Sequence, residues 1–373
     1  MYIPISEDIK KFYVNIQGTN YPVNRMLLNT QEVTGVEVYG DYYSQYFTIE
    51  SLEDNNVVML TKGTSTSVPD VTFYYSTDGT TWTSTNDTTS WNLDKNDKIM
   101  LKATTNRLHS GSDQKWGGWS ITGTKTHNAY GNIMSLLYGD DFEDKTLVYS
   151  YSFAYLFVGN SYLINTKNLK LPNNATTYCY SHMFDSCTAL ATSPTLPATT
   201  MQTGCYIDMF WNCFSLTTAP ELPATTLAAS CYTEMFRECR ALVNAPVLPS
   251  TTLSYRCYYN MFSGCTSLVN APVLPATTLA SYCYYYMFQG CTSIVESPEL
   301  PAPTLVEGCY SNMFSGCTSL NKVTCLATDI GGNTAGWLYN VASTGTFYKD
   351  STMTNWPSGD SGIPTGWTIQ NYN

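Results

Sequence analysis

The amino-acid sequence predicts a mainly β protein with short helical arms, in which an N-terminal β segment and a β-sandwich precede a repeat solenoid capped at both ends. Two observations carry this prediction. A phrase recurs at a fixed interval in the second half of the chain, and aromatic and β-branched residues alternate in the first half. Hydrophobic residues make up 43% of the 373 residues, enough to pack a core. We expect four regions, which span residues 1–45, 46–145, 146–328 and 329–373.

The first region is expected to be a small β-hairpin or a repeated strand. The stretches IKKFYVNI (9–16) and VNRMLLNT (23–30) align at an offset of 14 residues, and Gly18, Thr19 and Asn20 lie between them as turn material. Short duplicated strands of this kind resemble the N-terminal attachment modules of phage fibre-type proteins. That resemblance implies attachment to a virus particle, whereas the alternative is an ordinary hairpin packed on the next domain. The candidate attachment residues are Ile9, Lys11, Phe12, Val23, Arg25 and Met26.

The second region reads as an immunoglobulin-like or jelly-roll-like β-sandwich. The stretch VTFYYSTDGTTWTST alternates around Asp78-Gly79, a dipeptide typical of hairpin turns. DKIMLKATT, KWGGWSITGT and YGNIMSLLYG continue the same strand spacing toward residue 139. The stretch GDDFEDKT at 139–146 is acidic, but it lacks the spaced ligands of a calcium loop and is interpreted as a solvated linker.

The third region contains six units of equal length, each as long as the step from Cys179 to Cys205. Met-Phe recurs in each unit from Met183-Phe184 to Met313-Phe314, and a fixed period of this length is typical of a solenoid. Each unit is expected to hold a short strand, a turn and a short helical or irregular arm. Its first cysteine, its methionine and its second cysteine lie at positions i, i+4 and i+8, which form one stripe if the arm is helical. The first cysteines of the units are Cys179, Cys205, Cys231, Cys257, Cys283 and Cys309, and the second are Cys187, Cys213, Cys239, Cys265, Cys291 and Cys317.

The repeated phrase Phe-x-Gly-Cys-Thr-Ser-Leu, followed by Pro-x-Leu-Pro, resembles the BspA-like leucine-rich repeats in a cysteine-rich variant. The resemblance covers about residues 157 to 326. It implies a right-handed leucine-rich-repeat solenoid of a kind usually displayed on surfaces for adhesion or recognition. Before the six units lies a degenerate one with Asn160 where a cysteine belongs, which fits a capping repeat. The Trp- and Gly-rich residues 329–373 are expected to cap the other end.

All 13 cysteines fall in the repeats. Buried free thiols that pack as small hydrophobic groups are the favoured interpretation, and disulfides between some units are the alternative. Within a helical arm the two cysteines would lie about 12 Å apart, beyond the reach of a disulfide. A zinc site would need clustered ligands, whereas His109, His127 and His182 are scattered. No metal and no cofactor are expected.

Five tyrosines form the candidate ligand-binding site. Positions that vary between the units belong on the surface, and several of them hold tyrosine in the fourth and fifth units. Tyrosine combines flat apolar area with a hydroxyl group, which suits sugars and the hot spots of protein interfaces. The alternative is that these side chains only solubilise the solenoid and pad their neighbours. The candidates are Tyr255, Tyr259, Tyr282, Tyr285 and Tyr286.

Several classes of function are disfavoured. The net charge of −11 argues against nucleic-acid binding, and no apolar run reaches the roughly 20 residues of a membrane span. No signal peptide is visible, so export by that route is not expected. Glu221 and Glu299 share a register but lie about 14 Å apart at the usual strand spacing, too far for a pair of glycosidase carboxylates. We therefore expect no enzyme.

These observations favour a non-enzymatic structural and recognition protein. The main hypothesis is a bacteriophage virion fibre or decoration protein, assembled in the host cytoplasm. It would dock on capsid or tail proteins by its N-terminus and present the solenoid to a host-surface glycan or protein. One alternative is a BspA-like adhesin on a bacterial cell surface, and a third is a glycan-cleaving spike. A homo-oligomer is expected, with a trimer as one form.

Overall fold

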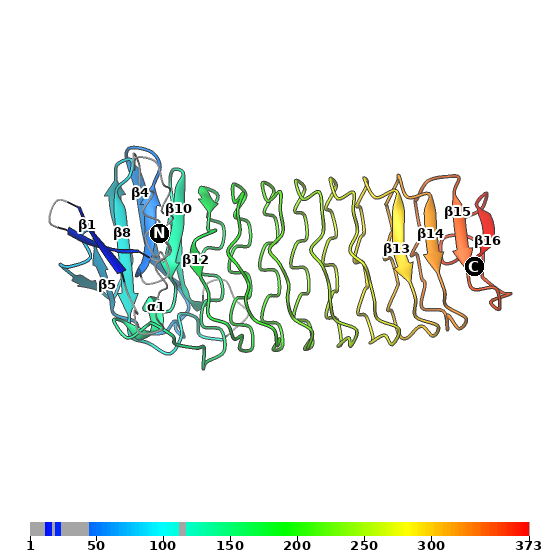
Figure 1. Ribbon diagram of the computed structural model, residues 1–373, viewed down its shortest axis with the longest axis horizontal. Helices are drawn as coiled ribbons and strands as arrows, with labels where there is room; N and C mark the ends of the chain where they lie inside the picture. Colours follow the sequence, from blue (N-terminus) through cyan, green and yellow to red (C-terminus); the bar gives the residue numbers. More distant parts are fainter. Residues whose placement is uncertain (1–11, 17–18, 24–44, 112–116, 373) are drawn as a thin grey trace, which may run out of the picture.

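The computed structural model describes residues 12–16, 19–23, 45–111 and 117–372. Two layers of β-strands at one end continue into a long row of rungs that runs to the C-terminal end (Figure 1). The first two strands, β1 (Phe12–Ile16) and β2 (Thr19–Val23), pair antiparallel with Phe12 opposite Val23. Thr19 pairs with Ile16 and so begins the second strand, although the sequence had suggested a turn residue.

The attachment residues are only partly covered by these strands. Phe12 and Val23 lie in β1 and β2, whereas Ile9, Lys11, Arg25 and Met26 lie outside the described residues.

Two facing sheets form the β-sandwich. The larger sheet has the order β10-β3-β8-β5-β6, and the smaller has the order β7-β4-β9. Alternate residues along the strands are fully buried between the two sheets, among them Ile49, Val58 and Ile121. A single short helix, α1 (Ser135–Tyr138), follows. The strands are β3 (Phe47–Ser51), β4 (Asn56–Lys62), β5 (Phe73–Ser76), β6 (Thr83–Thr85), β7 (Thr89–Leu93), β8 (Lys98–Ala103), β9 (Trp119–Gly123) and β10 (His127–Asn132).

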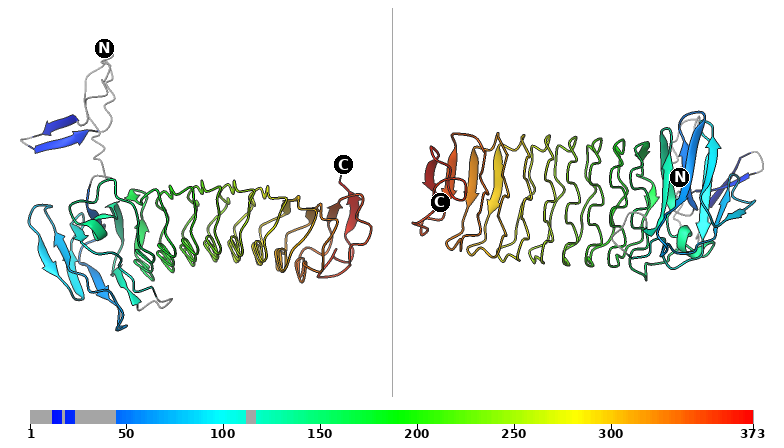
Figure 2. Two further views of the ribbon diagram at one scale, coloured as in Figure 1. Left: turned by 90° about the horizontal axis from the view of Figure 1, so that it is seen from below. Right: turned by 180° about the vertical axis from the view of Figure 1, so that it is seen from behind.

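The sandwich passes into the solenoid without a break. Strand β10 pairs antiparallel with β3 on one side, and on the other it pairs parallel with β11 (Leu163–Asn165) and β12 (Leu169–Lys170) of the first rung. One hydrophobic core therefore runs from Phe47 in the sandwich to Trp367 near the C-terminus. Figure 2 shows the rungs following the edge of the sandwich in line.

The arm of each unit is a chain of turns and not the helix that the sequence had suggested. The backbone N–H groups of Cys179 and Met183 donate to the residue three positions earlier, whereas those of Tyr180 and Phe184 donate to the next rung. Every fourth residue has a left-handed backbone, with φ of 54° at His182 for example. These conformations interrupt a helix. The spacing of four residues between the cysteines and the methionine therefore reflects a four-residue turn.

On the opposite side of the rungs the strands are reduced to single bridges in the middle of the solenoid, such as Thr200 with Thr226 and Asn244 with Asn270. Two prolines in each stretch of the type APVLP remove donors from the ladder. Regular parallel pairing returns further along the chain. Its strands are β13 (Glu296–Leu300), β14 (Lys322–Cys325), β15 (Thr346–Lys349) and β16 (Thr368–Asn371).

Residues 329–372, in the region 329–373 that was expected as a cap, add further rungs to the solenoid. The indole of Trp337 stacks on Tyr310, the last ring in a buried column of tyrosines that begins at Tyr180, with 6.4 Å between the ring centroids. Trp356 in turn stacks on Trp337 at 5.6 Å and an interplanar angle of 6°. Tryptophan thus takes the place of tyrosine and extends the same column.

Buried columns of identical side chains hold the rungs together. Neighbouring rings of the tyrosine column from Tyr180 to Tyr310 lie 5.5–6.1 Å apart, and those of the phenylalanine column from Phe157 to Phe314 lie 5.3–5.8 Å apart. Stacked rings bury large apolar areas at favourable distances.

All 13 cysteines are free thiols and buried. The second thiol of a unit donates to the phenylalanine carbonyl of the preceding rung, as Cys265 does to Phe236 at 3.0 Å. Burial raises the pKa of Cys257 to about 12, so this thiol stays protonated at neutral pH.

Candidate functional site

The structure brings the five candidate tyrosines together on the outer side of the turn arms. Each arm buries its Cys-Tyr and Met-Phe pairs, whereas Tyr259, Tyr285 and Tyr286 between them are half-buried. Tyr259 and Tyr285 occupy the same outward position on adjacent rungs and stack at 5.1 Å. Tyr286 meets Tyr285 edge to face at 4.4 Å. Tyr255 and Tyr282 meet in the same way at 6.1 Å. The ring of Tyr282 also lies 5.5 Å from that of Tyr285. We call the five tyrosines together with Arg256 the tyrosine–arginine patch.

Arg256 lies at the centre of this patch, and the sequence analysis did not identify it. Its guanidinium carbon is 5.1 Å from the ring centroid of Tyr255, 5.2 Å from that of Tyr259 and 5.5 Å from that of Tyr282. Cation–π contacts with three rings hold the charge in place without removing it from solvent, since Arg256 is exposed. The sequence does contain a signal for Arg256, because Arg256 lies one full period before the candidate Tyr282 and therefore occupies the same register position.

Local hydrogen bonds define the rim of the patch. The Tyr282 hydroxyl donates to Glu307 at 2.9 Å, and this bond raises the pKa of Tyr282. Burial and a hydrogen bond with Tyr286 raise the pKa of Tyr285 to about 12. These phenols therefore remain protonated hydrogen-bond donors at neutral pH. On the other side Glu234 pairs with Arg237 at 2.6 Å.

A second cluster of polar side chains lies on the turn arms three rungs earlier. His182 is placed between two carboxylates, with Nδ1 3.1 Å from Asp185 and Nε2 3.3 Å from Asp208. Asp208 is 8% exposed, and its Oδ1 atom has no hydrogen-bond partner. Burial raises the pKa of Asp208 to about 7.

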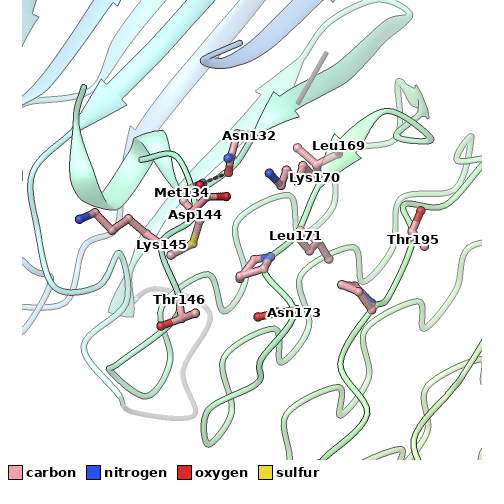
Figure 3. A pocket seen from close by; sticks show the side chains of 12 residues that line it. Asn132, Met134, Asp144, Lys145, Thr146, Leu169, Lys170, Leu171, Asn173 and Thr195 are labelled. Carbon is pink, nitrogen blue, oxygen red and sulfur yellow. Dashed lines mark hydrogen bonds between the residues drawn. The ribbon is translucent and has the colours of Figure 1, made fainter. Parts of the chain in front are cut away.

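A pocket of about 470 Å³ lies where the sandwich meets the first rungs (Figure 3). Met134, Leu169 and Leu171 contribute apolar surface, while Asp144 and Lys145 contribute charged groups from the stretch that was interpreted as a linker. None of the candidate residues from the sequence lines this pocket. It is therefore separate from the tyrosine–arginine patch.

Two further findings limit the chemistry of the described residues. Within residues 45–111 and 117–372, no three histidine, cysteine or acidic side chains are grouped so as to hold a metal ion. No helix in the described part of the chain has the length and apolar character needed to cross a membrane.

The stacked rungs, their buried columns and the outward patch define a leucine-rich-repeat solenoid protein. In a comparison with protein-family models, residues 154–291 and 229–334 match the BspA type leucine rich repeat region in six copies. Residues 154–334 thus form a BspA-like leucine-rich repeat region, and the resemblance of the repeated phrase to these repeats is confirmed. Repeats of this type indicate a surface or recognition protein of the adhesin type. No curated protein matches the chain, and neither does any solved structure.

Proposed function

We propose that the protein is a non-enzymatic virion fibre or decoration protein whose solenoid binds a glycan or protein on a host surface through the tyrosine–arginine patch. The patch itself carries this proposal. Rings from two adjacent rungs converge on one exposed guanidinium, and tyrosine and arginine are among the residues that are enriched at binding hot spots. The surrounding columns make the support rigid, so little conformational entropy is lost on binding.

In this proposal the N-terminal segment docks on capsid or tail proteins. The support is the duplicated sequence pattern at residues 9–30 and the antiparallel pairing of β1 with β2. The sandwich then acts as a spacer, because its strand β10 pairs directly with strands β11 and β12 of the first rung. Homo-oligomerisation of the whole fibre is part of the same proposal.

A BspA-like adhesin on a bacterial surface is equally consistent with the family. Immunogold labelling of the source material separates the two assignments. We expect label on purified virus particles, and label confined to the bacterial envelope would favour the adhesin. A glycan-cleaving spike is a third candidate, and release of reducing ends from host polysaccharide would support it.

The binding role is tested with the full chain and a double variant, Tyr259→Ala with Tyr285→Ala. We expect the wild-type protein to bind isolated envelope fractions or an array of bacterial glycans, and the double variant to lose about tenfold or more in affinity, as hot-spot truncations do. Tyr162→Ala is the matched control, because Tyr162 is 44% exposed and lies outside the patch. Equal binding by all three proteins would remove the patch from the proposed function.

A further inference from the structure

Arg256 and its tyrosines carry an inference about the ligand, which rests on the proposed function. We propose that the tyrosine–arginine patch selects an acidic saccharide, whose anionic group binds the Arg256 guanidinium while its hydroxyl groups and C–H surface contact the surrounding tyrosines.

The guanidinium of Arg256 has no acidic partner among the described residues. The repeat region contains three arginines. Arg237 pairs with Glu234 at 2.6 Å, and Arg240 pairs with Glu238 at 2.9 Å. The guanidinium of Arg256 contacts three aromatic rings instead. A guanidinium carries five N–H donors in a planar fork that matches a carboxylate. Cation–π contacts do not use these donors, so the fork can still bind an anionic group.

The nearby carboxylates do not neutralise this charge, because both are engaged elsewhere. Glu307 accepts a hydrogen bond from Tyr282 at 2.9 Å. Glu234 binds Arg237 and also accepts from Asn260 at 3.4 Å. They flank the patch on two sides, and the chain as a whole carries a charge of −11. A ligand with one anionic group at the centre is therefore favoured, whereas a polyanion would be repelled at the rim.

The ring orientations favour a sugar over a peptide. Tyr259 and Tyr285 lie nearly parallel, at 13°, and stack on each other, whereas Tyr282 and Tyr286 stand at 66° and 83° to Tyr285. The patch thus offers ring edges, hydroxyl groups and perpendicular faces beside one cation. A pyranose has alternating hydroxyl and C–H surface and matches this mixture, while an apolar peptide side chain would leave the hydroxyl groups unpaired.

The test uses the full chain and four probes: a galactose oligomer with a single terminal galacturonate, the neutral galactose oligomer of the same length, a singly sulfated galactose oligomer and an acidic peptide. We expect the singly carboxylated or the singly sulfated oligomer to bind about tenfold or more tightly than the neutral oligomer, which is the contribution of one charge-assisted hydrogen-bonded pair. The ratio between these two probes identifies the anionic group. Arg256→Gln should abolish the preference for the charged sugar, and Arg256→Lys should retain part of it.

Arg240→Gln is the control, since Arg240 is an exposed arginine of the adjacent unit that already has a carboxylate partner, and it should leave the preference unchanged. A preference that persists in Arg256→Gln would overturn the inference. So would equal binding of neutral and charged oligomers, binding of the acidic peptide alone, or no binding of any anionic sugar at millimolar concentration. If neutral and charged oligomers bind equally and the double tyrosine variant loses this binding, the proposed function stands without the inference about the ligand. If neither the arginine variants nor the double tyrosine variant changes binding, the proposed function is wrong as well.

Discussion

The left-handed backbone at every fourth position of the arms is the residue-scale feature on which the solenoid depends. Such a conformation costs a residue with a side chain about 1–2 kcal/mol, and glycine avoids this cost. Glycine occupies the position in some rungs, at Gly204 and Gly308, but Arg256 and Tyr282 adopt it in the two rungs of the patch with φ of 54° and 57°. Strain of this kind concentrates at functional sites. The patch thus holds its central side chains at a backbone cost that Tyr178 and Ser230 also bear in their rungs, and that only the rungs with Gly204 and Gly308 avoid.

The absence of a side chain at Gly308 leaves room for the ring of Tyr282. A Cβ atom at Gly308 would lie 2.5 Å from the Tyr282 ring, whereas one at Gly332, a glycine with a similar backbone, would meet nothing within 4 Å. We expect Gly332→Ala to lower the free energy of unfolding by about 1–2 kcal/mol through backbone strain alone. Gly308→Ala should cost more and weaken ligand binding, because Tyr282 must move. Denaturant titration with a binding assay checks this, and equal losses of stability in the two variants would contradict it.

Asp208 makes stability depend on pH. Burial raises its pKa from 3.8 in the unfolded chain to about 7, and the neighbouring charged groups are His182, Asp185, Glu234 and Arg237. Between about pH 4 and pH 7 the folded protein holds a proton that the unfolded chain has released, so stability falls as pH rises through this window. Asp208→Asn should flatten the dependence and stabilise the protein at pH 8 by a few kcal/mol relative to wild type.

The measurement is the free energy of unfolding from denaturant titrations at several pH values. Glu221→Gln is the control, because Glu221 is an exposed carboxylate on the strand side of the same solenoid. If the stability of Asp208→Asn follows the wild-type pH profile, the carboxyl group of Asp208 is not the group that binds the proton.

At the scale of elements, one repeat unit is the module of the fold. Its arm donates hydrogen bonds to the next rung at every second residue, and its inward pairs continue the buried columns. Each unit contacts only its neighbours, so the stability of such an array is close to a sum over units and interfaces. The number of units can therefore change without changing the fold.

Deletion of residues 205–230 tests this modularity. The deletion joins Gly204 to Cys231 and keeps the register of the columns, because it removes one full period. We expect a folded, monodisperse protein with a modestly lower midpoint of thermal unfolding by circular dichroism. Deletion of residues 205–217 is the control, since half a period would place outward residues in the columns and should prevent folding. A full-period deletion that fails to fold, or a half-period deletion that folds equally well, would contradict a modular solenoid.

At the scale of the whole molecule, the sandwich and the solenoid share one core. The junction includes the side chain of Asn160, whose Nδ2 group donates to the Ile121 carbonyl at 3.1 Å and lies 3.0 Å from His127 Nε2. His127 Nδ1 lies 2.8 Å from the Lys125 carbonyl, and burial lowers the pKa of His127. The neutral ring can therefore donate from Nδ1 and accept from Asn160. An asparagine in place of a cysteine thus connects the first rung to strands β9 and β10.

We expect the two parts to unfold together, and Asn160→Ala to lower the stability of both by about 1–3 kcal/mol through the loss of buried hydrogen bonds. Hydrogen exchange with mass spectrometry, followed on β4 and on residues 179–187, measures the two parts separately. Cys187→Ala, a change at the matching position of the next rung, is the control. Two separate unfolding transitions in the wild-type protein would contradict a shared core.

Much of this architecture could be predicted from the sequence because a strict period leaves the same signal in every unit. The inward Cys, Tyr, Met, Phe and Leu positions, the solenoid and the five surface tyrosines all follow from register, since residues one period apart stack on adjacent rungs. The arm conformation did not follow, because residues four apart share a face both in a helix and in a row of four-residue turns. Only the hydrogen bonds to the next rung distinguish the two.

By itself, then, the sequence determined which side chains face inward and how the units succeed one another, because identical units can bury their apolar residues only by stacking. Three contacts were decided only by the tertiary structure, because no periodic signal contains them. Strand β10 pairs with the first rung, tryptophans extend the tyrosine column at the C-terminal end, and Arg256 lies among three tyrosine rings. Such contacts depend on how side chains of two rungs meet in space, and the order of residues along one rung does not specify them.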